Sequence, residues 1–316
     1  MSGPATISVI APIYGVELYI EDFLHSLLGQ SYPHLQFVFV NDGTKDNSMS
    51  ILHSVVEKSY SHLSDRIVIV NKENGGLPAA RRTGVEHATG DYVYHVDPDD
   101  WLSDGALAEI AEVIRKTGAD VVYFNYVKEY GNRSSIKKER VYTWQDRHEF
   151  IRNMYNHKSY GTLCNKCVKR SLYTENAIFF PKYSYAEDCY VSVQLVGYAD
   201  SLAYLDFDVY HYRKTNPGAI TRQGRKKRKN EYAMNFLDLY EKYRDVPSAE
   251  NPVEVLFDDI LIQAGWYSIA YGLDLFSKFP YLADAICHSK IRTGSDVLLP
   301  FQLFTKIYSG LFKLLK

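Results

Sequence analysis

The sequence has few cysteines and no segment that reads as an export signal or a membrane span. Only four of its 316 residues are cysteine, too few for a fold stapled by disulfides. The N-terminal residues, MSGPATISVIAPIY, contain no basic segment followed by a long apolar run. No apolar stretch reaches the roughly 18–20 residues that a spanning helix needs. We therefore expect a reducing, cytoplasmic location.

The chain also lacks a charge excess and a glycine-rich phosphate loop. Its formal net charge is −2, so attraction to anions must be local. No glycine-rich loop leads into Lys-Ser or Lys-Thr, which argues against an ATPase or GTPase. Pro12-Ile13-Tyr14 stands where a nicotinamide enzyme carries G-x-G-x-x-G. Cys164 and Cys167 form a lone C-x-x-C, which fits buried thiols better than a zinc or redox site.

What the first 125 residues contain is a regular alternation of strand and helix patterns. Short runs rich in β-branched and aromatic residues predict strands at Ile7–Ala11, Leu35–Val40, Arg66–Val70, Asp91–Val96 and Ala119–Asn125. Segments with helical spacing lie between them, at 17–28, 46–58, after Gly76 and from 104 to before Gly118. This alternation predicts an α/β fold with a mostly parallel, Rossmann-like sheet flanked by helices.

The pattern changes toward the C-terminus. We expect a loop at 131–138, helices at 145–156 and 187–198, a short strand or ordered bend at 164–170, and separate strands at 202–206 and 209–213. Residues 228–243, 253–275 and 300–316 all have helical spacing. We therefore predict a catalytic domain at 1–221 and a helical C-terminal region at 222–316.

Polar and aromatic residues follow four of the predicted strands. They are Pro12 with Tyr14, Asn41 with Asp42, Asn74 with Gly75 and Gly76 and then Arg81, and the run from Asp97 to Asp100. Ligands of open α/β sheets bind outside the carboxyl ends of the strands. We therefore expect these residues to line one crevice.

The run Asp97-Pro98-Asp99-Asp100 is the most distinctive of these strand ends. Three carboxylates within four residues repel one another unless a cation compensates them. Mg²⁺ and Mn²⁺ prefer carboxylate and phosphate oxygens. The alternative is a helix N-cap ahead of Trp101-Leu102. Its position at the end of a buried strand favours a metal site.

The order and spacing of these motifs resemble glycosyltransferase family 2. The matching segments are Ser8–Tyr14, Val40–Ser48, Asn74–Arg81, Gly90–Trp101, Asn165-Lys166, Glu187-Asp188 and Tyr210–Arg213. The resemblance covers about residues 6–221, and the members of this family include bacterial polysaccharide-type enzymes. It implies the fold called GT-A and an inverting transfer of a sugar from a nucleotide-sugar donor.

The resemblance also implies roles for the matching residues. Tyr14 and Asp42 would contact the nucleotide base, in a pocket shaped by Pro12. Arg81 would hold the nucleotide, and Asp97 would lie near the ribose and the metal. Asp99 would bind the Mn²⁺ or Mg²⁺ that bridges the donor diphosphate.

Two further motifs complete the implied site. Asp188 would be the general base, with Glu187 as the alternative base, although both also suit the N-terminal dipole of a helix. Arg213 would contact the donor diphosphate. His211 is a candidate metal ligand, or an ordinary core or surface histidine.

The resemblance thus predicts an enzyme, a hexosyl- or N-acetylhexosaminyl-type transferase. Its donor would be a nucleotide sugar, most simply a UDP-sugar, and its acceptor a hydroxyl of a glycan or lipid-linked sugar. A nucleotidyltransferase is one alternative, although that class normally carries a glycine-rich basic loop after the first strand. A catalytically inactive nucleotide-sugar-binding module is another, and the joint presence of Asp97, Asp99 and Asp188 argues against it.

Two basic or amphipathic segments suggest an anionic membrane surface as a partner. Residues 222–229 hold six cations in eight positions, which fits a membrane contact or a solvated loop better than nucleic-acid binding. At 300–316, aromatic and aliphatic residues would cover about half of a helix, with Lys306, Lys313 and Lys316 opposite. This pattern is typical of a helix in the membrane interface, or of a terminal helix docked on the core. We expect a peripheral association with the inner face of the cell membrane.

Overall fold

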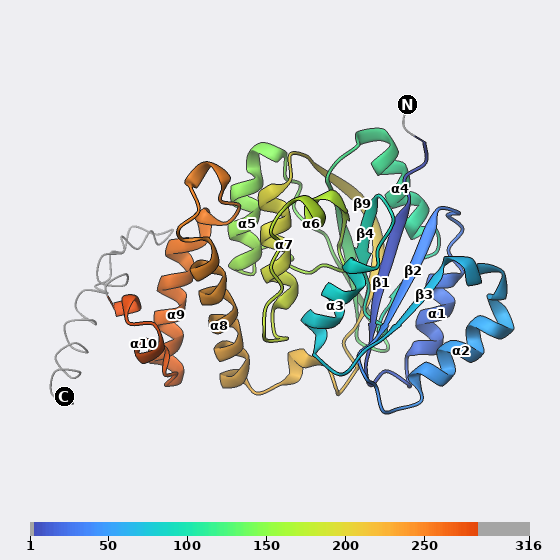
Figure 1. Cartoon of the computed structure of the whole chain (residues 1–316), viewed down its shortest axis with the longest axis horizontal. Coiled ribbons are helices and arrows are strands. Elements are labelled where there is room, and N and C mark those ends of the chain that lie inside the picture. The colour runs from blue at the N-terminus through green and yellow to red at the C-terminus, as the bar shows by residue number, and fades with distance from the viewer. Residues whose placement is uncertain (1–2, 284–316) are drawn as a thin grey trace.

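A nine-stranded sheet with helices on both faces forms the centre of the protein in the computed structural model, which describes residues 3–283 (Figure 1). The strands are β1 (Ile7–Ile13), β2 (Leu35–Asn41), β3 (Ile67–Asn71), β4 (Tyr92–His95), β5 (Trp101–Leu102), β6 (Val121–Glu129), β7 (Ser134–Lys137), β8 (Lys166–Lys169) and β9 (Leu202–Arg213). The helices are α1 (Ile20–Leu28), α2 (Ser48–Ser59), α3 (Leu77–Glu86), α4 (Ala106–Thr117), α5 (Arg147–Tyr155), α6 (Ser171–Glu175), α7 (Glu187–Tyr198), α8 (Arg225–Tyr243), α9 (Phe257–Tyr271) and α10 (Leu275–Lys278).

The sheet has a parallel half and a mixed half. Its strand order is β3-β2-β1-β4-β8-β6-β9-β5, with β7 on the edge of β6. The first four strands in this order are parallel, as the sequence predicted. β8 runs antiparallel to both of its neighbours, while β6 and β9 are parallel to each other. The predicted α/β fold is confirmed, with a return strand in the middle that joins the two halves.

Each face of the sheet has its own hydrophobic core. On one face α1, α2 and α4 cover alternate strand residues such as Val9 and Phe39. On the other face α3, α5 and α7 cover the residues between them, such as Ile10 and Val38. Because both faces are covered, the central strands are mostly apolar, and β1 is buried at all seven positions, including Ser8.

Two local predictions were wrong. The polar segment 131–138 is not only a loop, because Ser134–Lys137 forms β7, which pairs with the end of β6. The two strands expected at 202–206 and 209–213 are one strand, β9, whose register against β6 shifts around Asn125. These irregularities add three residues to β9 without ending the strand, so the apolar pattern is interrupted while the pairing continues.

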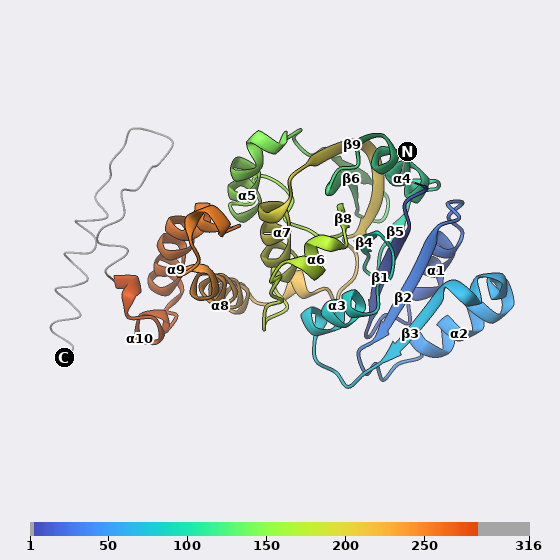
Figure 2. The ribbon, with the colours of Figure 1, turned by 45° about the horizontal axis from the view of Figure 1, so that its top comes forward.

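The helices that follow residue 221 pack against α5 and α7 (Figure 2). Phe236 and Leu237 of α8 and Ile260 of α9 are fully buried, in the same core cluster as Tyr190 of α7. The sheet, α5 and α8 therefore enclose α7, which explains why nine of its twelve residues are buried. No helix within residues 3–283 is long and apolar enough to cross a bilayer. The amphipathic segment 300–316 lies outside the described residues.

Candidate active site

A cleft of about 830 Å³ opens at the carboxyl ends of β1, β2 and β4, between the sheet and α7. It brings together seven of the residues that the sequence singled out: Pro12, Tyr14, Asp42, Arg81, Asp97, Asp99 and Asp188. They come from five separate segments of the chain, and parallel strands place the ends of these segments at one edge. The predicted crevice is present, but Asn41, Gly75 and Asp100, which the sequence also placed there, do not line it.

The rim of the cleft carries an exposed ring beside a buried carboxylate. The side chain of Tyr14 is 57% exposed although aromatic rings are usually covered. Asp42 is 3% exposed, and its oxygens accept hydrogen bonds from the backbone N–H groups of Gly75 and Gly76 at 2.9 Å and from Lys72 Nζ at 2.6 Å. Asp42 therefore fixes the loop before α3, which forms one wall beside the ring of Tyr14.

Arg81 connects two acidic segments that are far apart in sequence. It is 1% exposed, and Nε donates to Glu187 Oε1 at 2.8 Å while Nη2 donates to Asp97 Oδ1 at 2.8 Å. Coulombic attraction from these carboxylates raises the pKa of Arg81 against the opposing effect of burial, so the guanidinium remains charged. Arg81 thereby fixes the distance between the end of β4 and the start of α7.

Asp97 lies close to the charged side chains of Arg81, Asp99 and Asp188. Burial raises the pKa of Asp97 to about 6. The charge of Arg81 opposes this shift, and the charges of Asp99 and Asp188 add to it. Its side chain keeps 27% of its surface exposed to the cleft. Asp97 can therefore still meet a ligand, and a cation there would compete with a proton.

The remainder of the acidic run is tied to β9. Asp100 is 1% exposed and accepts hydrogen bonds from Tyr210 Oη at 2.6 Å and from the backbone N–H of Arg213 at 2.7 Å. Asp99 stays in the cleft, where Asn216 Nδ2 donates to Asp99 Oδ2 at 2.8 Å. The two neighbouring carboxylates thus differ: Asp100 anchors the loop, and Asp99 faces the cleft.

Glu187 and Asp188, the first two residues of α7, differ in burial: Glu187 is buried and Asp188 is partly exposed. Glu187 is fully buried and bonded to Arg81, and burial raises the pKa of its carboxyl. Asp188 lines the cleft. The residue before them, Ala186, has a φ of 61°, a left-handed conformation that costs a non-glycine residue about 1 kcal/mol or more. Within residues 3–283, His157 is the other non-glycine residue with positive φ, and it lines the same cleft. Strain of this kind is often concentrated at functional sites.

Asp97 and Asp99 supply two carboxylates to the cleft, and within residues 3–283 no group of three or more His, Cys, Asp or Glu side chains is placed to hold a metal ion. A pair of carboxylates fits a hard divalent ion that takes its other ligands from water and substrate phosphates, as Mg²⁺ commonly does. The residues present therefore fit an ion that binds together with a diphosphate.

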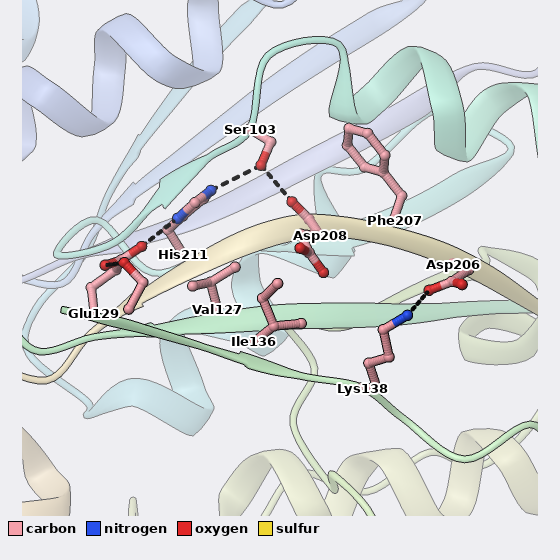
Figure 3. Close-up of a pocket in the computed structure, with 10 residues that line it drawn as sticks. Ser103, Val127, Glu129, Ile136, Lys138, Asp206, Phe207, Asp208 and His211 are labelled. Atoms are coloured by element: carbon pink, nitrogen blue, oxygen red, sulfur yellow. Dashed lines mark hydrogen bonds and ion pairs between the residues drawn. The ribbon is translucent and has the colours of Figure 1, made fainter.

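Arg213 and His211 lie outside the cleft. Successive side chains of a strand point to opposite faces, so Tyr212 and Lys214 line the cleft while His211 faces a second cavity of about 680 Å³ (Figure 3). There His211 Nδ1 contacts Glu129 Oε1 at 2.8 Å and Nε2 contacts Ser103 Oγ at 2.9 Å. The guanidinium of Arg213 packs over the rings of Trp101 and Tyr19.

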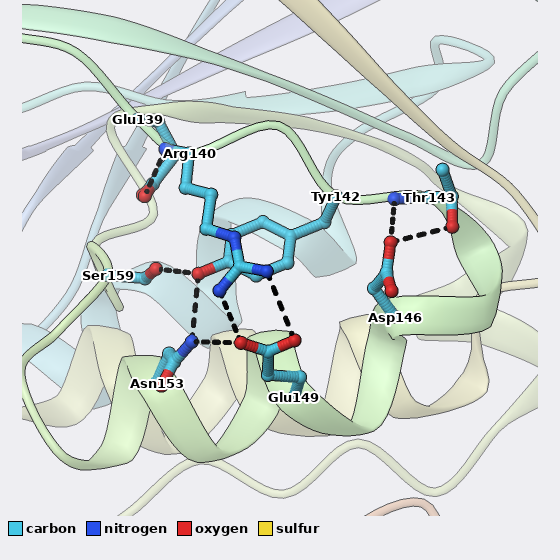
Figure 4. Close-up of polar contacts among 8 residues, drawn as sticks. All are labelled: Glu139, Arg140, Tyr142, Thr143, Asp146, Glu149, Asn153 and Ser159. Carbon is cyan, nitrogen blue, oxygen red and sulfur yellow. Dashed lines mark hydrogen bonds and ion pairs between the residues drawn. The ribbon is translucent and has the colours of Figure 1, made fainter.

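A polar network fixes the chain segment that leads into α5. Arg140 pairs with Glu149, and Thr143 and Asp146 form a capping box ahead of α5 (Figure 4). Asn153 Nδ2 donates to Tyr142 Oη at 3.1 Å. These contacts hold α5, whose end contributes Met154 to the cleft.

The loop that follows α5, at residues 160–166, is held by a buried lysine. Lys166 is 1% exposed, and Nζ donates to the carbonyls of Tyr160 and Thr162 and to Asn165 Oδ1 at 2.6–2.9 Å. Burial lowers the pKa of Lys166 to about 8. All three of its hydrogens have acceptors, so Lys166 holds the loop rather than facing a substrate.

Sequence reasoning missed part of the cleft. Lys128 at the end of β6 and Lys214 and Asn216 after β9 line it, together with residues 218–221. Asn216-Pro217-Gly218 is a turn signal that could have marked this loop. The inward position of the two lysines followed from strand alternation only once the register of β6 and β9 was known.

Comparison with known proteins identifies the family. The sequence model described as "Glycosyl transferase family 2" matches residues 8–176 of this chain. This chain belongs to glycosyltransferase family 2. The protein EpsH of Bacillus subtilis is 29% identical over 221 residues, which is 67% of this chain and 62% of EpsH. The chain therefore spans less than two thirds of that relative.

Solved structures support the GT-A fold of this family 2 chain. The structure of residues 1–349 of TarS of Staphylococcus aureus, in complex with UDP-GlcNAc, has a TM-score of 0.64 at 21% identity, over 89% of this chain and 79% of that one. In the curated relatives TarS is a poly(ribitol-phosphate) beta-N-acetylglucosaminyltransferase. The mannosyltransferase PcManGT of Pyrobaculum calidifontis, solved with GDP-Man and Mn²⁺, has a TM-score of 0.55 at 19% identity, over 98% of this chain and 86% of that one.

Proposed function

We propose that this family 2 glycosyltransferase transfers a hexosyl or N-acetylhexosaminyl group from a nucleotide sugar, a UDP-sugar in the first instance, to a hydroxyl of a glycan or lipid-linked acceptor. The transfer proceeds by direct displacement with inversion at the anomeric carbon. The observation that carries the proposal is that Asp188 lines the same cleft as Tyr14, Asp97 and Asp99. A base and a donor site for a diphosphate thus share one space.

Asp188 is the proposed general base. It takes the proton of the acceptor hydroxyl as that oxygen attacks the anomeric carbon, and the bond to the donor diphosphate breaks. Glu187 is not accessible for this step, because it is fully buried and bonded to Arg81. Its proposed role is to hold Arg81, which in turn holds Asp97.

Asp99 and Asp97 are the proposed ligands of Mn²⁺ or Mg²⁺. When bound, such an ion offsets the negative charge that grows on the leaving diphosphate. Tyr14 offers its exposed ring to the base of the nucleotide, and Pro12 lines the same cleft. Both oxygens of Asp42 already hold the loop at 75–76, so Asp42 shapes the base pocket whether or not it also accepts from the base.

A nucleotide-release assay tests the proposal. The protein is incubated with Mn²⁺ and a panel of UDP-, GDP- and TDP-sugars, with and without EDTA, beside Asp99→Asn and Asp188→Asn. We expect slow, EDTA-sensitive release of one nucleotide that both variants lose. Donor binding without any release in the presence of acceptors would indicate a binding module. Absence of both binding and release would remove the donor-site assignment.

We also propose a peripheral association with the inner face of the cell membrane through residues 222–229 and 300–316. Within the first of these, Arg225, Lys226 and Lys227 are exposed in the first turn of α8. Cations at a helix N-terminus oppose its dipole, which favours an external anion as their partner. Flotation with anionic liposomes of the full chain, and of a chain ending at Pro300, tests the two segments separately. Failure of the full chain to float would end this part of the proposal.

A further inference from the structure

Two half-buried lysines line the cleft beside the acidic run. Lys128 stands at the end of β6 and Lys214 directly after β9, and both face the cleft because each lies two residues from another cleft residue, Tyr126 and Tyr212. Lys214 Nζ lies 4.4 Å from the centre of the Tyr212 ring, and Lys128 Nζ lies 5.7 Å from that of Tyr126. Aromatic faces support both ammonium groups from below.

Neither ammonium group has a carboxylate within 4.0 Å in the described part of the chain, whereas Lys72 and Arg81 each have one. The neighbouring charges have the same sign. Burial, Lys214 and Lys137 lower the pKa of Lys128. Burial and Arg222 lower the pKa of Lys214, against the opposing effect of Asp100, whose oxygens are already bonded to Tyr210 and to the backbone of Arg213.

This arrangement costs stability in the absence of a partner. Each lysine loses hydration, and the two repel each other across the parallel pairing of β6 and β9. The backbone positions of both lysines are fixed by the sheet, because Lys128 lies in β6 and the backbone N–H of Lys214 donates to the carbonyl of Glu129 at 2.8 Å. A partly buried cation pair without a counter-charge is complementary to an anion with several oxygens.

We propose that Lys128 and Lys214 form a phosphate-binding subsite in the cleft, distinct from the carboxylates at 97–99. The inference rests on the assignment of this cleft as the substrate cleft. The phosphate can come from two sources: the diphosphate of the donor, or a phosphate carried by an anionic acceptor. Residues 218–221 also line the cleft and come directly before the exposed cations of α8 in the chain, so an anionic acceptor near the cleft would meet further positive charge.

Binding measurements on the full chain separate these sources. Lys128→Ala/Lys214→Ala, Lys128→Arg/Lys214→Arg and the control Lys58→Ala, an exposed lysine near the end of α2, are titrated with UDP plus Mn²⁺ and with a synthetic glycerol phosphate oligomer. We expect the double alanine variant to lose about tenfold or more in affinity for one probe, since charge-assisted hydrogen bonds are the stronger kind. The arginine variant and Lys58→Ala retain it.

The outcomes of these titrations decide whether the subsite exists and which phosphate it binds. Loss for the oligomer alone assigns the subsite to the acceptor, and loss for UDP alone assigns it to the donor. Equal affinities of wild type and double alanine variant for both probes overturn the subsite, and so does wild-type protein that binds neither. Wild type that binds the oligomer but not UDP keeps the subsite and removes the donor assignment. Thermal unfolding of the double alanine variant is expected at or above the wild-type temperature, because the repulsion is gone, and this shows that the variant folds.

Discussion

At the scale of single residues, adjacent carboxylates at the cleft differ in burial and in the groups they bind. Glu187 is fully buried while Asp188 faces the cleft, and Asp100 is buried while Asp99 faces the cleft. In each pair the buried carboxylate is hydrogen-bonded to the framework, and the other is available to a ligand. These pairs allow sharp tests, because neighbouring substitutions of the same kind have different expected results.

Asp188→Asn is expected to lower kcat for transfer by about 10²–10⁴-fold, the usual contribution of a general base. Donor affinity should change little, because Asp188 is proposed to act on the acceptor. Glu187→Gln should lower kcat by less, since the amide can still accept from Arg81. Steady-state kinetics and donor titrations of both variants check this. A smaller loss of kcat in Asp188→Asn than in Glu187→Gln would assign the role of general base to Glu187 instead.

Asp97 predicts a pH dependence of cation binding. Its pKa is about 6, whereas an aspartate of the unfolded chain titrates near 3.9. As the pH falls from about 7 to about 4, the folded chain takes up this proton before the unfolded chain does, so protonation favours the folded state in that window. The ionised ligand is lost at the same time. Mn²⁺ affinity should therefore fall about tenfold between pH 7 and pH 5. An Asp97→Asn variant with the same pH profile would contradict this.

Arg81→Met should destabilise the fold far more than Arg82→Met. Arg81 is 1% exposed and bonded to two carboxylates, and removing one partner of a buried ion pair costs about 3–5 kcal/mol. Arg82 is 63% exposed, its pair with Glu86 is 3.6 Å long, and such surface pairs contribute roughly 0.5 kcal/mol. Urea unfolding of both variants measures the difference. Similar midpoints would mean that Arg81 does not organise the site.

At the scale of elements, the approach of α3 to β1 determines where Arg81 lies. Gly84 of α3 faces Ile10 of β1, and a Cβ at Gly84 would lie 2.2 Å from Ile10 Cγ2. The helix can rest this close to the strand only because residue 84 has no side chain. Arg81 lies one turn before Gly84 on the same buried face.

Gly84→Ala is therefore expected to cost roughly 1–3 kcal/mol, the range for overpacking of a dense core. It should also weaken donor binding, because α3 carries Arg81 and begins at the loop held by Asp42. Gly224→Ala is the control, since its φ is −54° and nothing lies within 4 Å of the added carbon. Thermal unfolding and donor titration of both variants test this. Unchanged unfolding of Gly84→Ala would show that α3 can move away freely.

At the scale of the whole molecule, the C-terminal helices complete the core of the catalytic part. Tyr232, Phe236 and Leu237 of α8 are buried against the cluster that contains Tyr155 and Tyr190. Tyr232 Oη also donates to the carbonyl of Tyr155 at 2.6 Å. The boundary expected near residue 221 remains a prediction, but these contacts imply that the two sides do not fold independently.

A chain ending at Thr221 is accordingly expected not to fold cooperatively. It would expose the apolar faces of α5 and α7, at about 25 cal/mol per Å² of apolar surface. Circular dichroism melting and limited proteolysis compare it with a chain ending at Ala283, which keeps α8 and α9. A cooperative melt of the shorter chain at the temperature of the longer one would establish residues 1–221 as an independent domain.

The sequence by itself determined the strands and helices of the parallel half, because strands buried on both faces must be mostly apolar, and the polar residues that bind ligands follow the strand ends. It also indicated that Tyr14, Asp97 and Asp99 gather at the cleft, since parallel strands end at one edge. Only the tertiary structure decided the second half of the site. The pairing of β6 with β9 selects which alternate side chains face the cleft, so Tyr212 and Lys214 face it while His211 does not. A one-residue change of register would reverse that choice, and local sequence does not specify register across eighty residues of chain.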